Sequence, residues 1–242
     1  MSWFASWFDS EYYHLLYNHR NDEEAQQFLK NLALALPPFQ NKKALDLCCG
    51  KGRHSRWLAE QGFQVTGFDL SPHSIEDAKK MGPDSIHYEV RDMRADLGTE
   101  EFDFVFNLFT SFGYFDEPEE NALVLEQIHD ALQPGGYFIH DFLNPSGVLR
   151  NLKEKEAVVR EHTTFHIDRF VDEENFLCKN IRWEIDGNPM EFTERVYLFT
   201  PEDLEAMCDG LFERIEIFGD YQLNPLDEPH SPRQISIWKK IG

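Results

Sequence analysis

Two short apolar stretches in the first half of the chain each carry a carboxylate beside a turn, a pattern suited to a nucleotide-like ligand. The first contains Asp46 and leads into a turn with Gly50 and Gly52, and the second, residues 64–68, is followed by Asp69. Glycines in such a turn let the backbone approach a ligand closely, because a Cβ atom would collide with it. A carboxylate after the second strand can accept hydrogen bonds from a ribose diol.

The turn differs from the dinucleotide pattern G-x-G-x-x-G, because no third glycine follows Gly52 at the required spacing. Asp46 lies inside the strand before the turn, where its charge would repel a pyrophosphate. A carboxylate there suits a positively charged ligand, and S-adenosylmethionine carries an ammonium and a sulfonium group but no phosphate. These residues therefore favour S-adenosylmethionine over NAD.

Polar residues also follow the next apolar stretches. Asp92 comes directly after a third predicted strand, and a fourth strand over 102–108 contains Asn107. A fifth strand over 137–141 is introduced by a Pro-Gly-Gly turn at 134–136. Strand ends of parallel strands meet at one edge of a sheet, so these residues are expected to gather there.

With five strand ends in this order, the chain resembles the class I S-adenosylmethionine-dependent methyltransferases, whose first motif runs acidic-x-G-x-G-x-G. Asp46 matches the acidic position, and Gly50 and Gly52 match the last two glycines. Cys48 stands where the first glycine is usual, which places a small side chain near the methionine part of the ligand. The resemblance implies a Rossmann-like α/β fold, methyltransferase activity and S-adenosylmethionine as the cofactor.

The resemblance also implies which part of the cofactor each position contacts. The methionine part is expected at the first turn, the ribose hydroxyls at Asp69, and the adenine beside the residues after the second and third strands. Backbone atoms at the end of the fourth strand would lie near the sulfonium methyl group, and a tyrosine and an arginine of an N-terminal helix would cover the cofactor. In that order the expected residues are Asp46, Cys48, Gly50 and Gly52; Asp69; Leu70, Asp92 and Met93; Asn107 and Leu108; Tyr13 and Arg20.

Candidates for work on the acceptor lie at the fifth strand and in the C-terminal region. Methyl transfer is an in-line displacement that needs alignment and exclusion of water, but no covalent residue of the protein. His140 and Asp141 close the fifth strand, where either is a candidate base for an amine or hydroxyl acceptor, although a strand histidine is more often a core residue. Tyr114 is a candidate for an aromatic wall, and the segments 220–221 and 231–233 are candidates for binding a substrate acid.

Composition restricts the partners. The chain has 242 residues and a net charge of −21, so long-range repulsion disfavours nucleic acids and anionic membranes. Its four cysteines lack the paired spacing of a zinc site, no metal is expected, and a reduced, cytoplasmic protein fits. The start of the chain lacks the basic residues and long apolar run of a signal peptide.

The elements that must position these residues form one methyltransferase domain in this interpretation. Residues 1–38 are an N-terminal helical cap, with an aromatic arm over 1–9 and helices over 10–18 and 22–36. Residues 39–144 and 200–242 alternate strand and helix, which predicts a parallel sheet with helices on both faces. The last two strands, 212–218 and 234–238, follow a helix that begins at Thr200, and the resemblance implies that they form an antiparallel hairpin.

Residues 145–199 follow a different pattern, in which polar and apolar residues alternate as in antiparallel strands. Turn signals at 172–175 and at Asp186-Gly187 divide them into three predicted strands, 156–171, 176–186 and 190–199. We expect this β insertion to select the acceptor or to form a homodimer contact.

Three functions remain in competition on the sequence. The favoured one is methyl transfer from S-adenosylmethionine to a nitrogen or oxygen of a small-molecule acceptor. The second is an NAD-dependent oxidoreductase, and the third is a non-catalytic S-adenosylmethionine-binding regulator.

Overall fold

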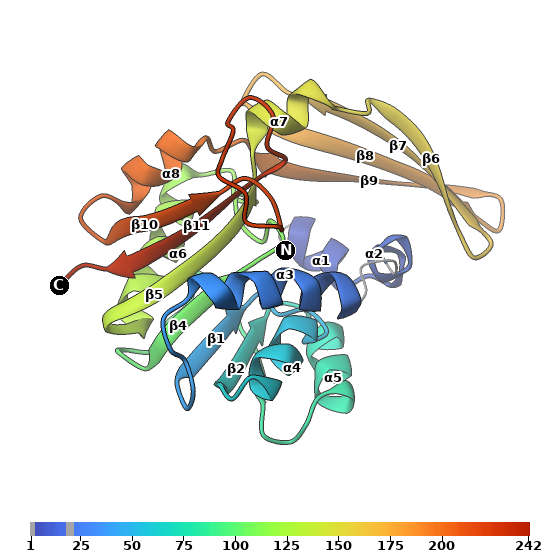
Figure 1. The fold of residues 1–242 in the computed structure, drawn as a ribbon. Helices are drawn as coiled ribbons and strands as arrows, with labels where there is room; N and C mark the ends of the chain where they lie inside the picture. Colours follow the sequence, from blue (N-terminus) through green and yellow to red (C-terminus); the bar gives the residue numbers. More distant parts are fainter. Residues whose placement is uncertain (1–2, 18–21) are drawn as a thin grey trace.

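The computed structural model describes residues 3–17 and 22–242 and contains two β-sheets. The smaller sheet lies beside the carboxyl ends of the parallel strands of the larger one (Figure 1). Seven strands form the larger sheet in the order β10-β11-β5-β4-β1-β2-β3. Strands β1 to β5 pair in parallel, and β11 is antiparallel to both of its neighbours. The strands of this sheet are β1 Lys43–Leu47, β2 Gln64–Asp69, β3 His87–Val90, β4 Phe102–Asn107, β5 Leu132–Leu143, β10 Phe212–Phe218 and β11 Arg233–Lys240.

The predicted Rossmann-like α/β class and the final antiparallel hairpin are thereby confirmed. The strand order reverses at β1. The strands β2 and β3 follow on one side of it, and β4 and β5 follow on the other side. In open α/β sheets a ligand binds outside the carboxyl ends of the strands at such a point. The fold therefore places the residues after β1, β2 and β4 around one site.

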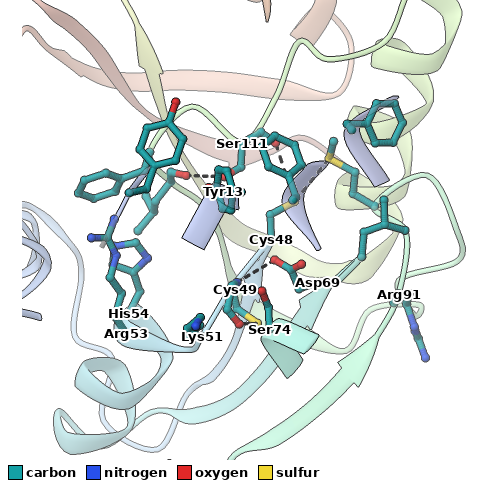
Figure 2. Close-up of a pocket in the computed structure, with 18 of the residues that line it drawn as sticks. Tyr13, Cys48, Cys49, Lys51, Arg53, His54, Asp69, Ser74, Arg91 and Ser111 are labelled. Atoms are coloured by element: carbon teal, nitrogen blue, oxygen red, sulfur yellow. Dashed lines mark hydrogen bonds between the residues drawn. The ribbon is translucent and has the colours of Figure 1, made fainter. Parts of the chain in front are cut away.

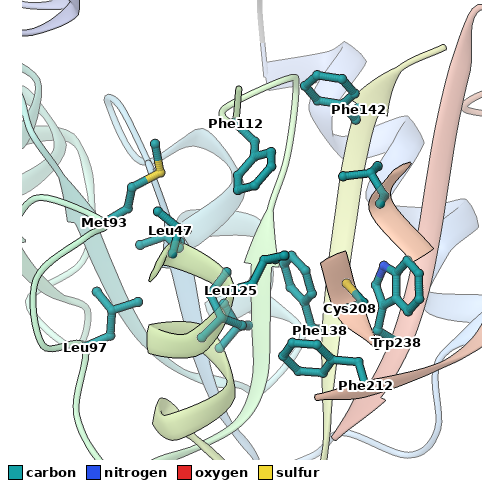
Figure 3. Packing of buried hydrophobic residues seen from close by; sticks show 14 of the residues in the cluster. Leu47, Met93, Leu97, Phe112, Leu125, Phe138, Phe142, Cys208, Phe212 and Trp238 are labelled. Atoms are coloured by element: carbon teal, nitrogen blue, oxygen red, sulfur yellow. The ribbon is translucent and has the colours of Figure 1, made fainter. Parts of the chain in front are cut away.

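Helices cover both faces of the larger sheet and enclose two hydrophobic cores (Figure 1). On one face α3, α4 and α5 bury residues such as Phe28, Trp57 and Ile75. On the other face α6 and α8 pack Leu125 and Cys208 against β5 and β11, as Figure 3 shows. The helices are α3 Asp22–Ala35, α4 Arg53–Glu60, α5 Pro72–Met81, α6 Pro118–Ala131 and α8 Pro201–Cys208.

Local sequence signals set the starts of several of these helices. Ser71 caps α5 by accepting the amide N–H of Ser74 at 2.9 Å, with a proline in the first turn. Thr200 and Asp203 form a reciprocal capping box at the start of α8. The start of α8 at Thr200 agrees with the sequence prediction.

The insertion forms a separate sheet of four strands in the order β6-β7-β8-β9, rather than the three that were predicted. Its hairpin at Asp186-Gly187 agrees with the prediction, but the expected strand 156–171 is broken by a turn at Glu161, whose φ is 50°. That turn lacks glycine, asparagine and proline, so no turn signal marked it. A short helix, α7 Pro145–Arg150, also precedes this sheet unpredicted, and the strands are β6 Lys155–Arg160, β7 Thr163–Val171, β8 Phe176–Ile185 and β9 Asn188–Tyr197.

The aromatic N-terminal segment is a helix, α1 Trp3–Phe8, where the sequence predicted an arm, and α2 Glu11–Leu16 follows it. Trp7 stacks on Phe192 of β9 with ring centroids 4.4 Å apart, and its indole Nε1 donates to Glu194 at 2.7 Å. These contacts tie the N-terminal helices to the four-stranded sheet beside the larger sheet (Figure 1). No helix within residues 3–17 or 22–242 is long and apolar enough to cross a membrane.

Candidate functional site

A cavity of about 440 Å³ opens at the carboxyl ends of β1, β2 and β4, where the fold predicts a ligand. Figure 2 shows Arg53 and His54 on one side of it and Asp69 and Arg91 on the other, with Cys48 between. Of the expected cofactor residues among those described, the lining includes Tyr13, Cys48, Gly50, Asp69, Leu70, Asp92, Met93 and Leu108.

The turn after β1 has an unusual backbone for its composition. Cys48, Gly50 and Gly52 have φ values of 64°, 54° and 73°. Left-handed backbone is easy for glycine, but a Cβ atom makes it costly for cysteine. Cys48 therefore keeps the conformation of the glycine that the family motif has at this position.

The two glycines of this turn serve different purposes. A Cβ atom on Gly50 would meet no atom within 4 Å, so its side faces the open cavity. A Cβ atom on Gly52 would come within 2.3 Å of the Tyr88 hydroxyl oxygen, and Gly52 does not line the cavity. Gly52 thus allows α4 to pack against β3, whereas Gly50 leaves room for a ligand.

Asp69 is held at the cavity by two backbone N–H groups. Its Oδ2 accepts from Gly50 and its Oδ1 from Ser71, both at 2.8 Å. Burial raises the pKa of Asp69, while these hydrogen bonds oppose that shift. Each carboxylate oxygen has a further lone pair, so the group can still accept hydrogen bonds from a diol.

Asp92, Met93 and Leu70 form the opposite part of the wall. Burial acts to raise the pKa of Asp92, but the bonds from the backbone and guanidinium of Arg94 outweigh it and leave the pKa below its usual value. Met93 lies with its Sδ 3.7 Å from the Cys48 Sγ. This side therefore combines a fixed carboxylate with apolar surface.

The cationic part of the cavity was missed by the sequence interpretation. Lys51, Arg53 and Arg56 line it together with the buried ring of His54, and all four residues lie in or just after the glycine turn that the motif identifies. His54 is only 5% exposed, and its Nε2 has no hydrogen-bond partner among the described residues. Burial and the neighbouring arginines hold the pKa of His54 well below its usual value, so the ring is neutral.

Two expected cofactor residues lie beneath the cavity instead of in its lining. Asp46 is 1% exposed and accepts the Ser55 hydroxyl at 2.5 Å, and burial raises its pKa to about 6. Asn107 is also buried and donates through Nδ2 to the Ser111 carbonyl at 3.1 Å. Asp46 therefore ties β1 to α4, and Asn107 holds the turn after β4.

The structure does not bring the expected catalytic residues to the cavity. His140 is 1% exposed and packs against Phe112, Phe138 and Phe142, and burial lowers its pKa to about 3. A base needs a path to its substrate, and a side chain enclosed by rings lacks one. The prediction of His140 as a base is corrected to a neutral core histidine.

Asp141 is likewise fully buried and holds a loop. Its carboxylate accepts the backbone N–H of Phe109 at 2.8 Å, the hydroxyl of Tyr221 at 3.2 Å and the Nε of Arg233 at 2.7 Å. Phe109 and Thr110 both have left-handed backbone, with φ values of 57° and 60°. Asp141 therefore fixes a strained loop beside the cavity, and its expected role as a base is corrected accordingly.

The N-terminal helices cover part of the site, although one expected residue cannot be placed. Tyr13 and Tyr17 line the cavity, as does His14, whose pKa burial lowers to about 4. Arg20 lies outside the described residues. No group of three or more side chains suited to a metal ion occurs in the part of the chain that the structure describes.

A second cavity of about 430 Å³ adjoins the first and lies against the four-stranded sheet. Five residues line both, namely Phe8, Tyr13, Tyr17, Phe109 and Tyr114. The other described residues around the second cavity include Arg169, Leu177, Lys179, Glu194, Arg195, Val196, Tyr221 and Arg233. Tyr114, Tyr221 and Arg233 were sequence candidates for the acceptor region, whereas the residues from β7 to β9 were not singled out.

Residues 44–136 match a family model described as a methyltransferase domain. An uncharacterized methyltransferase of Synechocystis sp. is 35% identical over 125 residues, which are 50% of this chain and 55% of that protein. The dTDP-3-amino-3,4,6-trideoxy-alpha-D-glucopyranose N,N-dimethyltransferase of Streptomyces venezuelae is 31% identical over 97 residues, 39% of this chain and 40% of that protein. The chain thus spans about half the length of the curated relatives that it matches.

The likeness in fold extends over nearly the whole chain. A crystal structure of an S-adenosylmethionine-dependent methyltransferase from Clostridium acetobutylicum has a TM-score of 0.77, covering 96% of this chain and 97% of that one at 16% identity. That likeness includes the four-stranded sheet as well as the matched residues 44–136. The named matches are all to proteins described as methyltransferases.

Proposed function

We propose that this chain is a class I S-adenosylmethionine-dependent methyltransferase, which its likeness to a methyltransferase domain model and to related proteins supports, and that it transfers a methyl group to a nitrogen or oxygen of a small-molecule acceptor. The observation that carries the proposal is the pair of adjoining cavities with a shared aromatic wall. In-line transfer needs two ligands end to end with water excluded between them. Two cavities that share five lining residues support such an arrangement.

The cofactor is proposed to occupy the first cavity, whose chemistry fits it. Asp69 offers acceptors for the ribose diol, and Lys51 and Arg53 offer positive charge for the carboxylate of the methionine part. The buried Nε2 of His54 is a further polar atom there in need of a partner. When bound, S-adenosylmethionine supplies an electrophilic methyl group on its sulfonium.

The remaining expected cofactor residues keep their proposed parts of the ligand. Leu70, Asp92 and Met93 would face the adenine, and the backbone at Leu108 would face the sulfonium end. Asp46 and Asn107 would act through the elements that they hold, since neither lines the cavity. Tyr13 and Arg20 remain proposed covering residues.

The acceptor is proposed to occupy the second cavity, with the insertion 145–199 as its cover. Strands β7, β8 and β9 contribute side chains to that cavity and none to the first. An amine acceptor is itself the nucleophile once it is neutral, so alignment matters more than a strong base. Glu194 is the one carboxylate among the described residues of that cavity and is the proposed acceptor of a proton.

The 31% identity to an enzyme named as an N,N-dimethyltransferase of an amino sugar supports nitrogen as the methylated atom. A contact between two copies through the insertion, and a cytoplasmic location, remain predictions. The regulator without activity is less favoured, because a protein that only sensed the cofactor would not need the second cavity.

Calorimetry and a transfer assay test the proposal. Titration with S-adenosylhomocysteine should give saturable binding, and NAD should give none. Incubation with tritiated S-adenosylmethionine and mixed small-molecule metabolites should then give labelled product. Tight NAD binding without S-adenosylhomocysteine binding would refute the cofactor assignment, and cofactor binding without labelled product would favour the regulator.

A further inference from the structure

The second cavity is cationic in a strongly acidic protein. The chain has 23 lysines and arginines against 44 aspartates and glutamates. Among the described residues around this cavity the balance is reversed, with four cations, Arg169, Lys179, Arg195 and Arg233, against the single carboxylate of Glu194. Cationic side chains gathered around one cavity can bind an anionic group of a ligand through charge-assisted hydrogen bonds.

The arginines are fixed by carboxylates that do not themselves line the cavity. Arg169 is paired with Glu156 and donates to the Lys153 carbonyl at 3.0 Å, while Arg233 is paired with the buried Asp141. Such anchoring holds a guanidinium in one orientation, so binding a ligand costs less side-chain entropy.

Arg195 is anchored more extensively than the others. Its Nη1 donates to Asp116 at 2.8 Å, and its Nη2 donates to Asp172 and Glu174 at 3.0 Å each. None of these carboxylates lines the cavity. A guanidinium has five N–H donors, so an anchored arginine keeps donors for an oxyanion.

The cations and the shared wall come from different elements. The three arginines are on β7, β9 and β11, whereas the wall shared with the cofactor cavity is aromatic and comes from α1, the α2 region and the loop after β4. An acceptor held by an acidic group at the arginines would present its other end toward the wall. The second cavity therefore has two parts. The arginines would bind the charged group of the acceptor, and the aromatic wall would lie beside the atom that receives the methyl group.

We propose that the acceptor carries an anionic group, a carboxylate or a phosphate ester, which Arg169, Arg195 and Arg233 bind in the second cavity. The inference rests on the proposed function, because it names the class of acceptor for that site. Arginine matches both oxyanions through paired N–H donors, so the two sources share one chemistry.

Pairs of acceptors that differ only in their anionic group distinguish a carboxylate from a phosphate ester. The protein is incubated with tritiated S-adenosylmethionine and paired compounds: amino acids against their amides, and amino sugar phosphates against the free amino sugars. Labelling of the anionic member of a pair over its neutral partner supports the proposal, and the pair that is labelled identifies carboxylate or phosphate. Equal labelling of both members, or no labelling of any anionic member, overturns it.

Variants then tie the preference to the cavity. Arg169→Gln and Arg195→Gln should each lower kcat/KM for the anionic acceptor by about tenfold or more, since each removes a charged hydrogen-bond donor. Arg182→Gln is the matched control, because Arg182 is also paired with a carboxylate on the same sheet but does not line the cavity. If Arg195→Gln unfolds the sheet, Arg195→Lys retains a charge and tests the loss of the paired donors alone.

S-adenosylhomocysteine affinity distinguishes failure of this inference from failure of the proposed function. Unchanged affinity with an unchanged kcat/KM in both glutamine variants would overturn the anionic acceptor and leave the methyltransferase proposal standing. Absence of S-adenosylhomocysteine binding by the unmodified protein would remove both.

Discussion

The two adjoining cavities are built from the chain in different ways. The first cavity, in which we propose that the cofactor binds, is lined by turns that directly follow β1, β2, β3 and β4, with the N-terminal helices as a cover. The second cavity takes its charged side chains from the strands β7, β8 and β9 of the smaller sheet and from β11 of the larger sheet. The first cavity is formed by residues that belong to local sequence motifs. The second cavity forms only where the two sheets come together.

This contrast explains their different chemistry. Turns after parallel strands supply backbone groups and two fixed carboxylates, Asp69 and Asp92, which suit a cofactor common to many proteins. Strand side chains can be exchanged without changing the fold, which suits an acceptor that differs from one protein to another. The loop that contains Phe109 and Thr110 contributes to both cavities. A change in this loop should therefore affect both cavities at once.

The largest effect is expected from Asp141→Ala, which removes the anchor of that shared loop. Breaking a buried ion pair with Arg233 and two further hydrogen bonds should cost about 3–5 kcal/mol of unfolding free energy. Urea denaturation measures this loss, and calorimetry should show weaker S-adenosylhomocysteine binding because Phe109 is no longer held. Asp141→Asn retains an acceptor for the Phe109 N–H and should lose less of both.

The same variants separate a positioning residue from a base. A base would make Asp141→Asn inactive at every pH with normal stability and normal cofactor affinity. That outcome would restore the catalytic role that the buried position of Asp141 argues against.

A smaller and more local effect is expected from Asp69→Ala, which should impair only the cofactor cavity. Charge-assisted hydrogen bonds to the ribose diol are worth about 1.5–3 kcal/mol each, so S-adenosylhomocysteine affinity should fall at least about tenfold. Calorimetry with a check of the unfolding temperature measures this. Unchanged affinity would place the ribose elsewhere, and an equal loss in Asp46→Asn would show that Asp46 also contributes.

Several residues that line the first cavity could be identified in the sequence, because the patterns that mark them are local. Asp69 was identified by its position after an apolar stretch, and Gly50 by its place in a turn between strand and helix. Arg53 and His54 were within the same motif, but helix residues that line a ligand resemble ordinary surface residues in a sequence. His140 was misassigned because a strand end marks a position along the chain, not which face of the sheet a side chain occupies.

The second cavity could not be predicted from local patterns. Arg169 and Arg195 lie in alternating strands, where a charged residue ordinarily faces solvent. Their position over a cavity depends on the angle between two sheets and on the aromatic contacts of Trp7. The residues that surround Arg169 and Arg195 in the sequence do not indicate how the two sheets are oriented relative to each other.

A pH-dependent effect on stability alone is expected from His140→Phe. The pKa of His140 is about 3 in the folded protein and near 6.5 when exposed. The unfolded state therefore binds the proton first, and stability is fully present above pH 6.5 and is lost as pH falls toward 3. At pH 5 this amounts to about 2 kcal/mol of unfolding free energy, which the phenylalanine variant should retain.

Chemical denaturation at pH 7.5 and pH 5 checks this difference between the two proteins. Methyl transfer at neutral pH should be unaffected, because His140 reaches neither cavity. A variant that folds normally but has lost activity would instead make His140 part of the reaction.

The smallest effect is expected from Cys48→Gly, which restores the usual glycine of the motif. The change relieves a left-handed backbone worth about 1–2 kcal/mol. It also removes the thiol that contacts Met93 and lies 3.9 Å from the Ser111 carbonyl, a burial loss of about 1 kcal/mol. Stability should therefore change by no more than about 1 kcal/mol, measured by urea denaturation.

Gly50→Ala is the matched comparison, because Gly50 is also left-handed but a Cβ atom there would enter the open cavity. That variant should lose stability and also weaken S-adenosylhomocysteine binding, whereas Cys48→Gly should leave binding nearly unchanged. If Cys48→Gly weakened binding more than Gly50→Ala did, the thiol itself would be a cofactor contact, and the local motif would carry more specificity than its backbone alone provides.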